Sequence, residues 1–381
     1  MIVIKPRNKK MEIGKVKTAM KKLLPVAASL LTLMSASAFA DYEVAIAGPM
    51  TGEYASAGEQ IRKGAEMAIA DINAKGGVLG QKLKLEIGDD ACDPKQAVSV
   101  ANAMVNKHIV FMHGHWCSSS TIPASEIYNE AQIPMATVST NPKVTERGLK
   151  NIFRIMGRDD QQGEIGGKFL ASKFANKKIA VVDDKSAYGK GLADEIAEGM
   201  GSKKPVLRES ITAGEKDYSG LVSKLKAAGV EVMAYGGYHT EVALILRQAQ
   251  QAGLKLQVLG GDTLSNNEIV GASGGNADAV MFTFAPDSRK NPEAADVVKR
   301  FRDAKVEPDG YVLYAYAAFQ LFQQAATQAK TVKYTDLQKK ALAGGTFNTV
   351  VGKLSFDAKG DLKSPGFVVY RWKGNQYDVL K

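Results

Sequence analysis

Residues 109–125 read IVFMHGHWCSSSTIPAS, and this stretch joins a buried β-strand to an α-helix. The apolar run 109–114 is short and ends at a glycine, which is typical of a strand in a parallel sheet. Hydroxyl-bearing residues follow it, and a helical segment that contains Pro123 and Ala124 comes next. A strand followed directly by a helix is the repeating unit of α/β folds, so this stretch predicts that class.

The same unit recurs on both sides of this stretch. Strands are predicted before residue 140 at 42–48, 82–88, 109–114 and 133–138. In the first helix, Ile61, Ala65, Ala68 and Ile72 share one face. Asp93 is expected to cap the next helix, with Pro94 in the first turn and Gln96 completing a capping box.

The alternation of strands and helices then begins again. Further strands are predicted at 177–184, 230–237, 256–262 and 279–286, with helices near 192–200, 218–229 and 240–253. Helices dominate 291–344, and the C-terminus favours short antiparallel strands with turns at Gly360 and Gly374. Two runs of right-handed βαβ units predict an α/β protein with two doubly wound, Rossmann-like lobes. A chain of 381 residues is long enough for both.

The formal charge of +10 is concentrated at the N-terminus. Residues 1–40 hold eight of the 50 basic residues and one of the 40 acidic ones, so the remainder carries only about +3. Without a basic run interleaved with aromatic residues, no nucleic-acid partner is expected. A basic stretch, an apolar run from Leu23 to about Met34, and small residues at Ala38 and Ala40 form a secretory signal pattern.

This leader predicts cleavage after Ala40 and a soluble mature protein outside the cytoplasm. The alternative, a membrane anchor, would need about 20 apolar residues, and the run has about a dozen. Cys92 and Cys117 are the only cysteines, and in an oxidising compartment an isolated pair predicts one disulfide. The four histidines do not cluster with both cysteines, so neither a metal nor another cofactor is expected.

Polar residues follow two strands of the predicted first lobe. Ser118, Ser119 and Ser120 stand where a strand ends and a helix begins, a position suited to a carboxylate. Ser139 and Thr140 follow the next strand, at the same edge of the sheet. Helix capping explains each group alone equally well. Together they predict a polar ring for a zwitterion.

In the second lobe Tyr188, Tyr238 and Asp262 follow strands. The tyrosines are candidates to close over a ligand, and Asp262 is a candidate partner for a ligand ammonium. Ordinary turn chemistry and helix capping are the alternative interpretations. Catalysis by Cys117 or Ser118 is not expected, because neither has an evident base and orienting group, and Cys117 has a partner in Cys92.

Several segments together resemble the leucine/isoleucine/valine-binding proteins, type I periplasmic binding proteins that serve ABC importers. These are DDACDPKQAVSVANAMV (89–105), GHWCSSSTIPAS (114–125), DKSAYGKGLA (184–193), ITAGEKDYSGLVSKLK (211–226), YGGYHTE (235–241) and KGDLK (359–363). The resemblance runs from about residue 41 to the C-terminus. It implies three crossings between the lobes, with lobe 1 at 41–158 plus 285–363 and lobe 2 at 159–284 plus 364–381.

The resemblance also implies roles for individual residues. The family's disulfide matches Cys92 and Cys117, and its carboxylate- and amine-binding serine matches Ser118. A carbonyl for the ammonium and a hydroxyl for the carboxylate match Ser139 and Thr140, in a loop one residue shorter here. The family's aromatic pocket contacts match Tyr188, Tyr238 and Tyr311.

Three positions depart from the family pattern. Asp262 replaces a glutamate, Ala57 an aromatic wall residue, and Trp116 a leucine. These changes leave the side-chain specificity open.

The expected function is capture of an α-amino acid, most consistent with Leu, Ile or Val, by a monomer that delivers it to membrane permease subunits of an ABC importer. The alternatives are the same fold binding an aromatic acid or amide, which would leave Asp262 without a partner, and a serine hydrolase.

Overall fold

The computed structural model describes residues 1–5 and 41–380. The predicted signal peptide and its cleavage site lie almost wholly outside the described residues. No helix in the described part of the chain has both the length and the apolar character needed to cross a membrane. Residues 41–381 form one compact unit, and the following description concerns that unit.

A five-stranded parallel sheet forms the centre of the first lobe. Its spatial order is β2-β1-β3-β4-β5. The strands are β1 (Tyr42–Gly48), β2 (Leu83–Asp89), β3 (Phe111–His113), β4 (Met135–Thr137) and β5 (Ile152–Arg154). The helices between them are α2 (Ala55–Ala74), α3 (Pro94–Asn106), α4 (Ser118–Glu130) and α5 (Lys143–Glu146). The order reverses between β1 and β3, the place where open α/β sheets bind ligands.

A seven-stranded sheet forms the centre of the second lobe, in the order β14-β13-β10-β9-β8-β6-β7. The strands are β6 (Ile179–Asp183), β7 (Leu207–Ser210), β8 (Val232–Gly236), β9 (Gln257–Gly260), β10 (Val280–Phe284), β13 (Val368–Lys373) and β14 (Gln376–Val379). The first five are parallel and repeat the strand order of the other lobe, whereas β13 and β14 are antiparallel. The prediction of two Rossmann-like lobes is confirmed.

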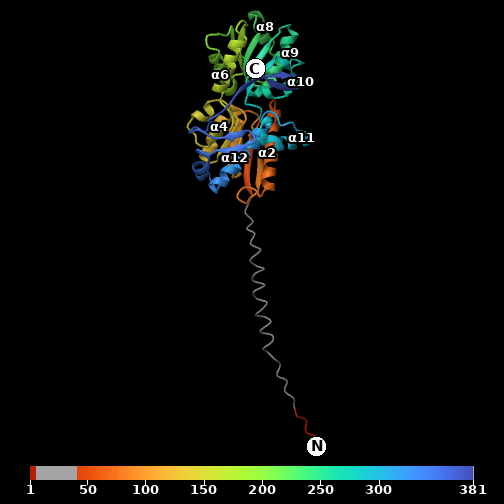
Figure 1. The fold of residues 1–381 in the computed structure, drawn as a ribbon, viewed down its shortest axis with the longest axis vertical. Helices are drawn as coiled ribbons and strands as arrows, with labels where there is room; N and C mark the ends of the chain where they lie inside the picture. The colour runs from red at the N-terminus through yellow and green to blue at the C-terminus, as the bar shows by residue number, and fades with distance from the viewer. Residues whose placement is uncertain (6–40, 381) are drawn as a thin grey trace. The chain divides into compact units, whose positions relative to one another are not determined.

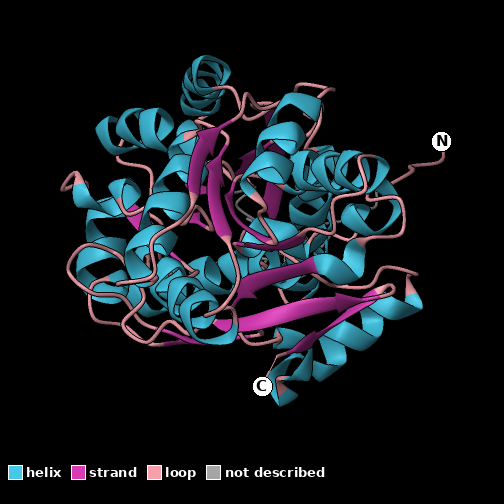
Figure 2. Ribbon diagram, turned by 90° about the horizontal axis from the view of Figure 1, so that it is seen from above, coloured by secondary structure: helices cyan, strands magenta, loops and turns pink. Residues whose placement is uncertain are grey.

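Helices cover both sheets (Figures 1 and 2). The second lobe carries α6 (Asp159–Lys173), α7 (Ala187–Gly199), α8 (Ser219–Ala228), α9 (His239–Gln251) and α10 (Glu268–Ala272). After β10 the chain continues through α11 (Ala295–Asp303), α12 (Val312–Ala329), α13 (Tyr334–Leu337) and the hairpin β11 (Phe347–Thr349) and β12 (Gly352–Leu354). Because α12 packs against α2, this segment belongs spatially with the first lobe.

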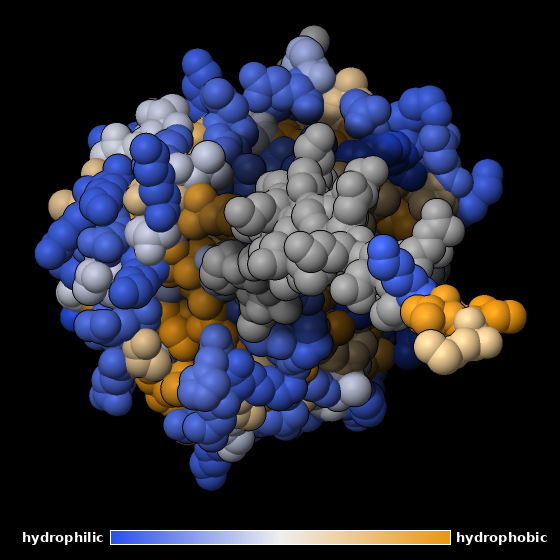
Figure 3. Space-filling model, turned by 90° about the horizontal axis from the view of Figure 1, so that it is seen from below, coloured by the Kyte–Doolittle hydropathy of each residue, from blue (hydrophilic) through white to orange (hydrophobic). Residues whose placement is uncertain are grey.

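The core follows from the apolar pattern. The predicted face of α2 is buried, with Ile61, Ala65, Ala68 and Ile72 all packed inward. This helix ends before Gly77, whose φ is +77° and where a Cβ atom would lie 1.9 Å from the Gln81 carbonyl oxygen. On the face seen in Figure 3, hydrophilic side chains predominate around the rim and hydrophobic surface is confined to smaller areas.

Two details differ from the predictions. Asp93 does cap α3, since Oδ1 accepts from the amides of Lys95 (2.8 Å) and Gln96 (2.7 Å). The Gln96 side chain, however, donates to the Asp89 carbonyl (2.7 Å), so the capping box is wrong. Strands β5 and β7 were not predicted: β5 has three residues, and β7 is an edge strand with exposed polar positions.

Candidate functional site

The polar strand ends of the two lobes face each other across a small cavity. Its wall consists of Trp116, Ser118, Val138, Ser139, Thr140, Tyr188, Tyr238, Asp262 and Thr263. Seven of these nine residues were predicted as site residues from the sequence. The cavity volume is about 10 Å³, room for about one water molecule. An amino acid therefore enters only when the walls move apart.

Asp262 is the central charge of the site. It lies directly after β9 and is buried. Its Oδ1 accepts from Gln162 Nε2 (2.9 Å) and Tyr188 Oη (3.0 Å), and its Oδ2 accepts from Tyr311 Oη (2.6 Å). All three donors are neutral. Among residues 1–5 and 41–380, no lysine, arginine or histidine forms an ion pair with Asp262, and burial raises the pKa of its carboxyl group.

Asp159 and Gln162 belong to the same charge system and were not predicted. Both lie near the start of α6, and no predicted strand directly precedes them. Gln162 Nε2 also donates to Asp159 Oδ1 (3.1 Å), so one amide bridges two buried carboxyl groups. Burial, and then the charge of Asp262, raise the pKa of Asp159 well above its usual value. Two buried carboxyl groups, joined by one amide, thus lie beside the cavity, and burial raises the pKa of both.

The first lobe contributes hydroxyl groups and backbone. Ser118 is the first residue of α4, and its Oγ accepts from the Asn141 amide (3.3 Å). Ser139 Oγ lies 2.9 Å from the carbonyl oxygens of both His115 and Trp116. The Ser139 hydroxyl is therefore engaged by neighbouring backbone. Together with Thr140, these residues bring a helix N-terminus and a strand end to one edge of the cavity, an arrangement that suits a carboxylate.

Aromatic rings form the remaining wall. The Trp116 and Tyr238 centroids are 5.3 Å apart, and those of Tyr188 and Tyr238 are 5.4 Å apart. Tyr311 stands at the start of α12 and is edge-on to Trp116 at 5.5 Å. The Tyr238 hydroxyl is buried and has no partner among the described residues. A ligand side chain at this wall would meet ring faces.

Tyr54 is an aromatic contact that was missed. Its ring centroid lies 4.4 Å from that of Tyr238 and 6.3 Å from that of Trp116. Ala57, expected at this wall, is buried one turn further along α2 and is not among the residues that line the cavity. The sequence does contain an aromatic residue here, three positions before the expected one. Tyr54 does not line the cavity either, and its ring packs behind Tyr238 and Trp116.

Direct hydrogen bonds join the lobes around the cavity. Tyr54 Oη donates to Glu241 Oε1 (2.9 Å), and Tyr311 Oη donates to Asp262. Asn141 Nδ2 donates to the carbonyl of Ala187 (2.6 Å). Contacts of this kind break and form when two lobes move about a hinge.

Glycines let the backbone come close to the site. A Cβ atom on Gly261, next to Asp262, would lie 2.4 Å from Tyr188 Oη and 2.5 Å from Leu192 Cδ2. Only a residue without a side chain permits this approach.

The disulfide between Cys92 and Cys117 is present and ties the start of α3 to the start of α4. Beside it, buried His115 Nδ1 lies 2.5 Å from Asp90 Oδ2, and its Nε2 lies 3.2 Å from Tyr128 Oη. Ser118 has no histidine partner in the part of the chain that the structure describes. No base is therefore in place to activate Ser118, and the disulfide occupies Cys117.

A family model described as "Periplasmic binding protein" matches residues 41–376. The chain belongs to this periplasmic binding protein family. The family is one of solute-binding transport proteins, and it implies a periplasmic location.

Relatives of this periplasmic binding protein carry more specific names. It is 46% identical over 351 residues to "Leu/Ile/Val-binding protein homolog 1" of Brucella melitensis, covering 91% of this chain and 95% of that one. It is 42% identical to the "Leucine-, isoleucine-, valine-, threonine-, and alanine-binding protein" of Pseudomonas aeruginosa, covering 93% and 97%.

A solved structure shares the fold of this periplasmic binding protein. The branched-chain amino acid transporter substrate-binding protein of Streptococcus pneumoniae, in complex with isoleucine, matches with a TM-score of 0.81 and 24% identity. It covers 90% of this chain and 99% of that one.

Proposed function

We propose that this protein captures an α-amino acid between its lobes, with Leu, Ile or Val as the preferred side chains. The observation that carries the proposal is the buried carboxyl group of Asp262, which three neutral donors contact and no cation neutralises in the described part of the chain. A buried charge without a counter-charge is costly, and a ligand α-ammonium supplies one.

The rest of the ligand follows from the same geometry. The ligand carboxylate lies at Ser118, Thr140 and the N-terminus of α4, where hydroxyl and amide donors converge. The ammonium pairs with Asp262. The Ser139 carbonyl, which was expected to share it, already accepts from Arg154 Nη1 (2.6 Å). The side chain lies against Trp116 and Tyr238. Aromatic faces favour an apolar side chain, in agreement with the names of the relatives.

The lobes separate and close by a hinge at the three chain crossings. We place the boundaries at 158/159, 284/285 and 363/364, so that the first lobe contains 41–158 plus 285–363. The mature chain begins at Asp41 after signal cleavage and acts as a monomer. It delivers its ligand to the permease subunits of an ABC importer and catalyses no reaction. Mass spectrometry of the exported protein tests the cleavage site, and light scattering tests the monomer.

Isothermal titration of the purified protein against the twenty amino acids tests the ligand. We expect one molecule of Leu, Ile or Val to bind per chain. The heat should stop changing once the sites are filled, and mass spectrometry should detect no product. Benzoate and phenylacetate serve as controls, because they carry a carboxylate and no ammonium. The proposal would be refuted if these acids bind and none of the twenty amino acids gives a measurable heat of binding.

A further inference from the structure

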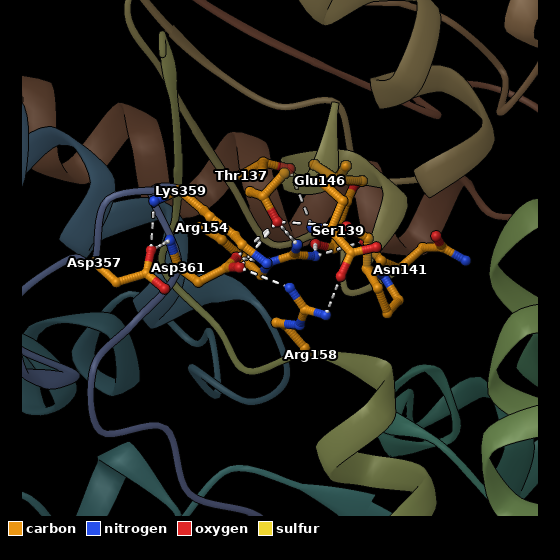
Figure 4. A network of polar contacts seen from close by, with 12 residues as sticks. Thr137, Ser139, Asn141, Glu146, Arg154, Arg158, Asp357, Lys359 and Asp361 are labelled. Carbon is orange, nitrogen blue, oxygen red and sulfur yellow. Dashed lines mark hydrogen bonds and ion pairs between the residues drawn. The ribbon is translucent and has the colours of Figure 1, made fainter. Parts of the chain in front are cut away.

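A buried arginine lies directly behind the ligand-binding loop (Figure 4). Arg154 is the last residue of β5, and its side chain is fully buried. Its Nε donates to Asp361 Oδ1 (2.8 Å), and its Nη2 donates to Thr145 Oγ1 (2.6 Å). Its Nη1 donates to two backbone carbonyls, those of Ser139 (2.6 Å) and Asn141 (2.9 Å).

The loop that accepts these bonds, residues 138–141, has no regular secondary structure. It supplies Val138, Ser139 and Thr140 to the cavity wall. The carbonyl between the two held by Arg154, that of Thr140, accepts from the amide of Asp159 (2.9 Å), the first residue of α6. Three consecutive carbonyl groups of the loop are therefore fixed by donors outside it. Two of the three depend on the orientation of one guanidinium group.

Asp361 fixes that orientation. It lies between β12 and β13, distant from the loop in sequence, and forms an ion pair with Arg154 and a second with Arg158 (3.0 Å). Thr145 Oγ1 contacts the same carboxylate at 3.0 Å. Burial opposes ionisation of Asp361, yet the two arginines hold its pKa below the usual value. Without Asp361 the Arg154 cation would be buried with no carboxylate partner, which strongly favours its rearrangement.

We propose that Arg154 and Asp361 are positioning residues for ligand binding, which hold the loop 138–141 in the conformation that the ligand requires. The ligand part of this inference rests on the proposed amino-acid function. Neither side chain lines the cavity, so both act through the loop. A segment near the C-terminus, KGDLK at 359–363, thereby controls affinity at a site formed by other parts of the chain.

The test compares Asp361→Asn with a matched control, Glu146→Gln. Glu146 is the half-exposed outer carboxylate of the same network and contacts Arg158 but not Arg154. Two quantities are measured well below each variant's melting temperature: hydrogen exchange of the peptide that covers 138–142, and the Kd for L-leucine. Thr145→Val, which removes one hydroxyl between Arg154 and Asp361 without changing charge, serves if Asp361→Asn does not fold.

We expect Asp361→Asn to accelerate exchange in 138–142 at least tenfold and to raise the leucine Kd at least tenfold, with Thr145→Val showing the same directions. Glu146→Gln should change both by less than threefold. A lower melting temperature with unchanged loop exchange and Kd would overturn the proposal, because it is the signature of a purely structural network. If the wild type does not bind leucine, the proposed specificity fails, while loop exchange still decides whether these residues position the loop.

Discussion

Replacing Asp262 by asparagine should change the ligand affinity and the stability of the unliganded protein in opposite directions. The substitution keeps the shape of the side chain and removes the carboxyl group that lines the cavity in the described part of the chain. Asp262 is 3% exposed and has no ion pair in residues 41–380, so the ligand cation would lose the buried carboxylate at the cavity wall. Such a loss costs about 3–5 kcal/mol. The Kd for L-leucine should therefore rise by roughly 100- to 5,000-fold.

The unliganded protein should respond in the opposite direction. Since burial raises the pKa of Asp262, its ionised form destabilises the folded state near neutral pH, and asparagine removes that cost. Titration calorimetry measures the Kd, and thermal unfolding without ligand measures stability. Asp183→Asn is the control: Asp183 is also buried, but it pairs with Arg208 (3.0 Å) and does not line the cavity. It should lower stability and leave the Kd within threefold.

Leucine binding to Asp262→Asn within threefold of the wild type would refute the role of Asp262 as the ammonium partner. A large loss of affinity accompanied by a matching loss of unliganded stability would instead mean that Asp262 is a structural residue. The Asp183 control distinguishes these outcomes, because it reports how much a buried carboxylate of the same lobe contributes to stability alone.

Three further predictions concern charge, covalent structure and packing. Because the pKa of Asp262 is raised from 3.8, the stability of the unliganded protein should fall as pH rises above that value, while the affinity for leucine should rise. Chemical unfolding across pH measures the stability, and calorimetric titration across pH measures the affinity. An affinity that does not change with pH would contradict the prediction. Replacing Cys92 and Cys117 by serine removes a cross-link over a separation of 25 residues and should cost about 3 kcal/mol in urea unfolding, with no further effect of reductant. Gly261→Ala should cost about 1–3 kcal/mol and weaken leucine binding, since the new methyl group displaces Tyr188, whereas Gly271→Ala, with open space around it, should do neither.

The apolar periodicity predicted both sheets because long strands and helices carry their own signal. The strand ends then located Ser118, Tyr188 and Asp262, since the carboxyl edge of a parallel sheet is defined by the same pattern. Asp159 and Gln162 could not be found this way: they lie within the first turn of a helix, where an acidic residue and an amide are unremarkable. Their role follows from a neighbour 100 residues away in the sequence.

Tyr54 shows a different limit. A likeness between sequences assigns a role to a position, and it placed the aromatic wall at Ala57 rather than one helical turn earlier. Packing tolerates such exchanges, because a ring from either position can fill the same space. The network of Arg154 and Asp361 could not be predicted from the sequence either, because β5 has only three residues and its buried arginine interrupts the apolar pattern.

The tight closure of the cavity determines how the ligand leaves. A cavity with room for about one water molecule cannot hold an amino acid, so a ligand enters and leaves only through a wider arrangement of these walls. Under the proposed hinge, the residence time of a ligand would depend on how often the lobes separate. Cross-lobe hydrogen bonds such as that from Tyr54 to Glu241 would slow the separation of the lobes without contacting the ligand. A transporter that separates the lobes would thus control the timing of release.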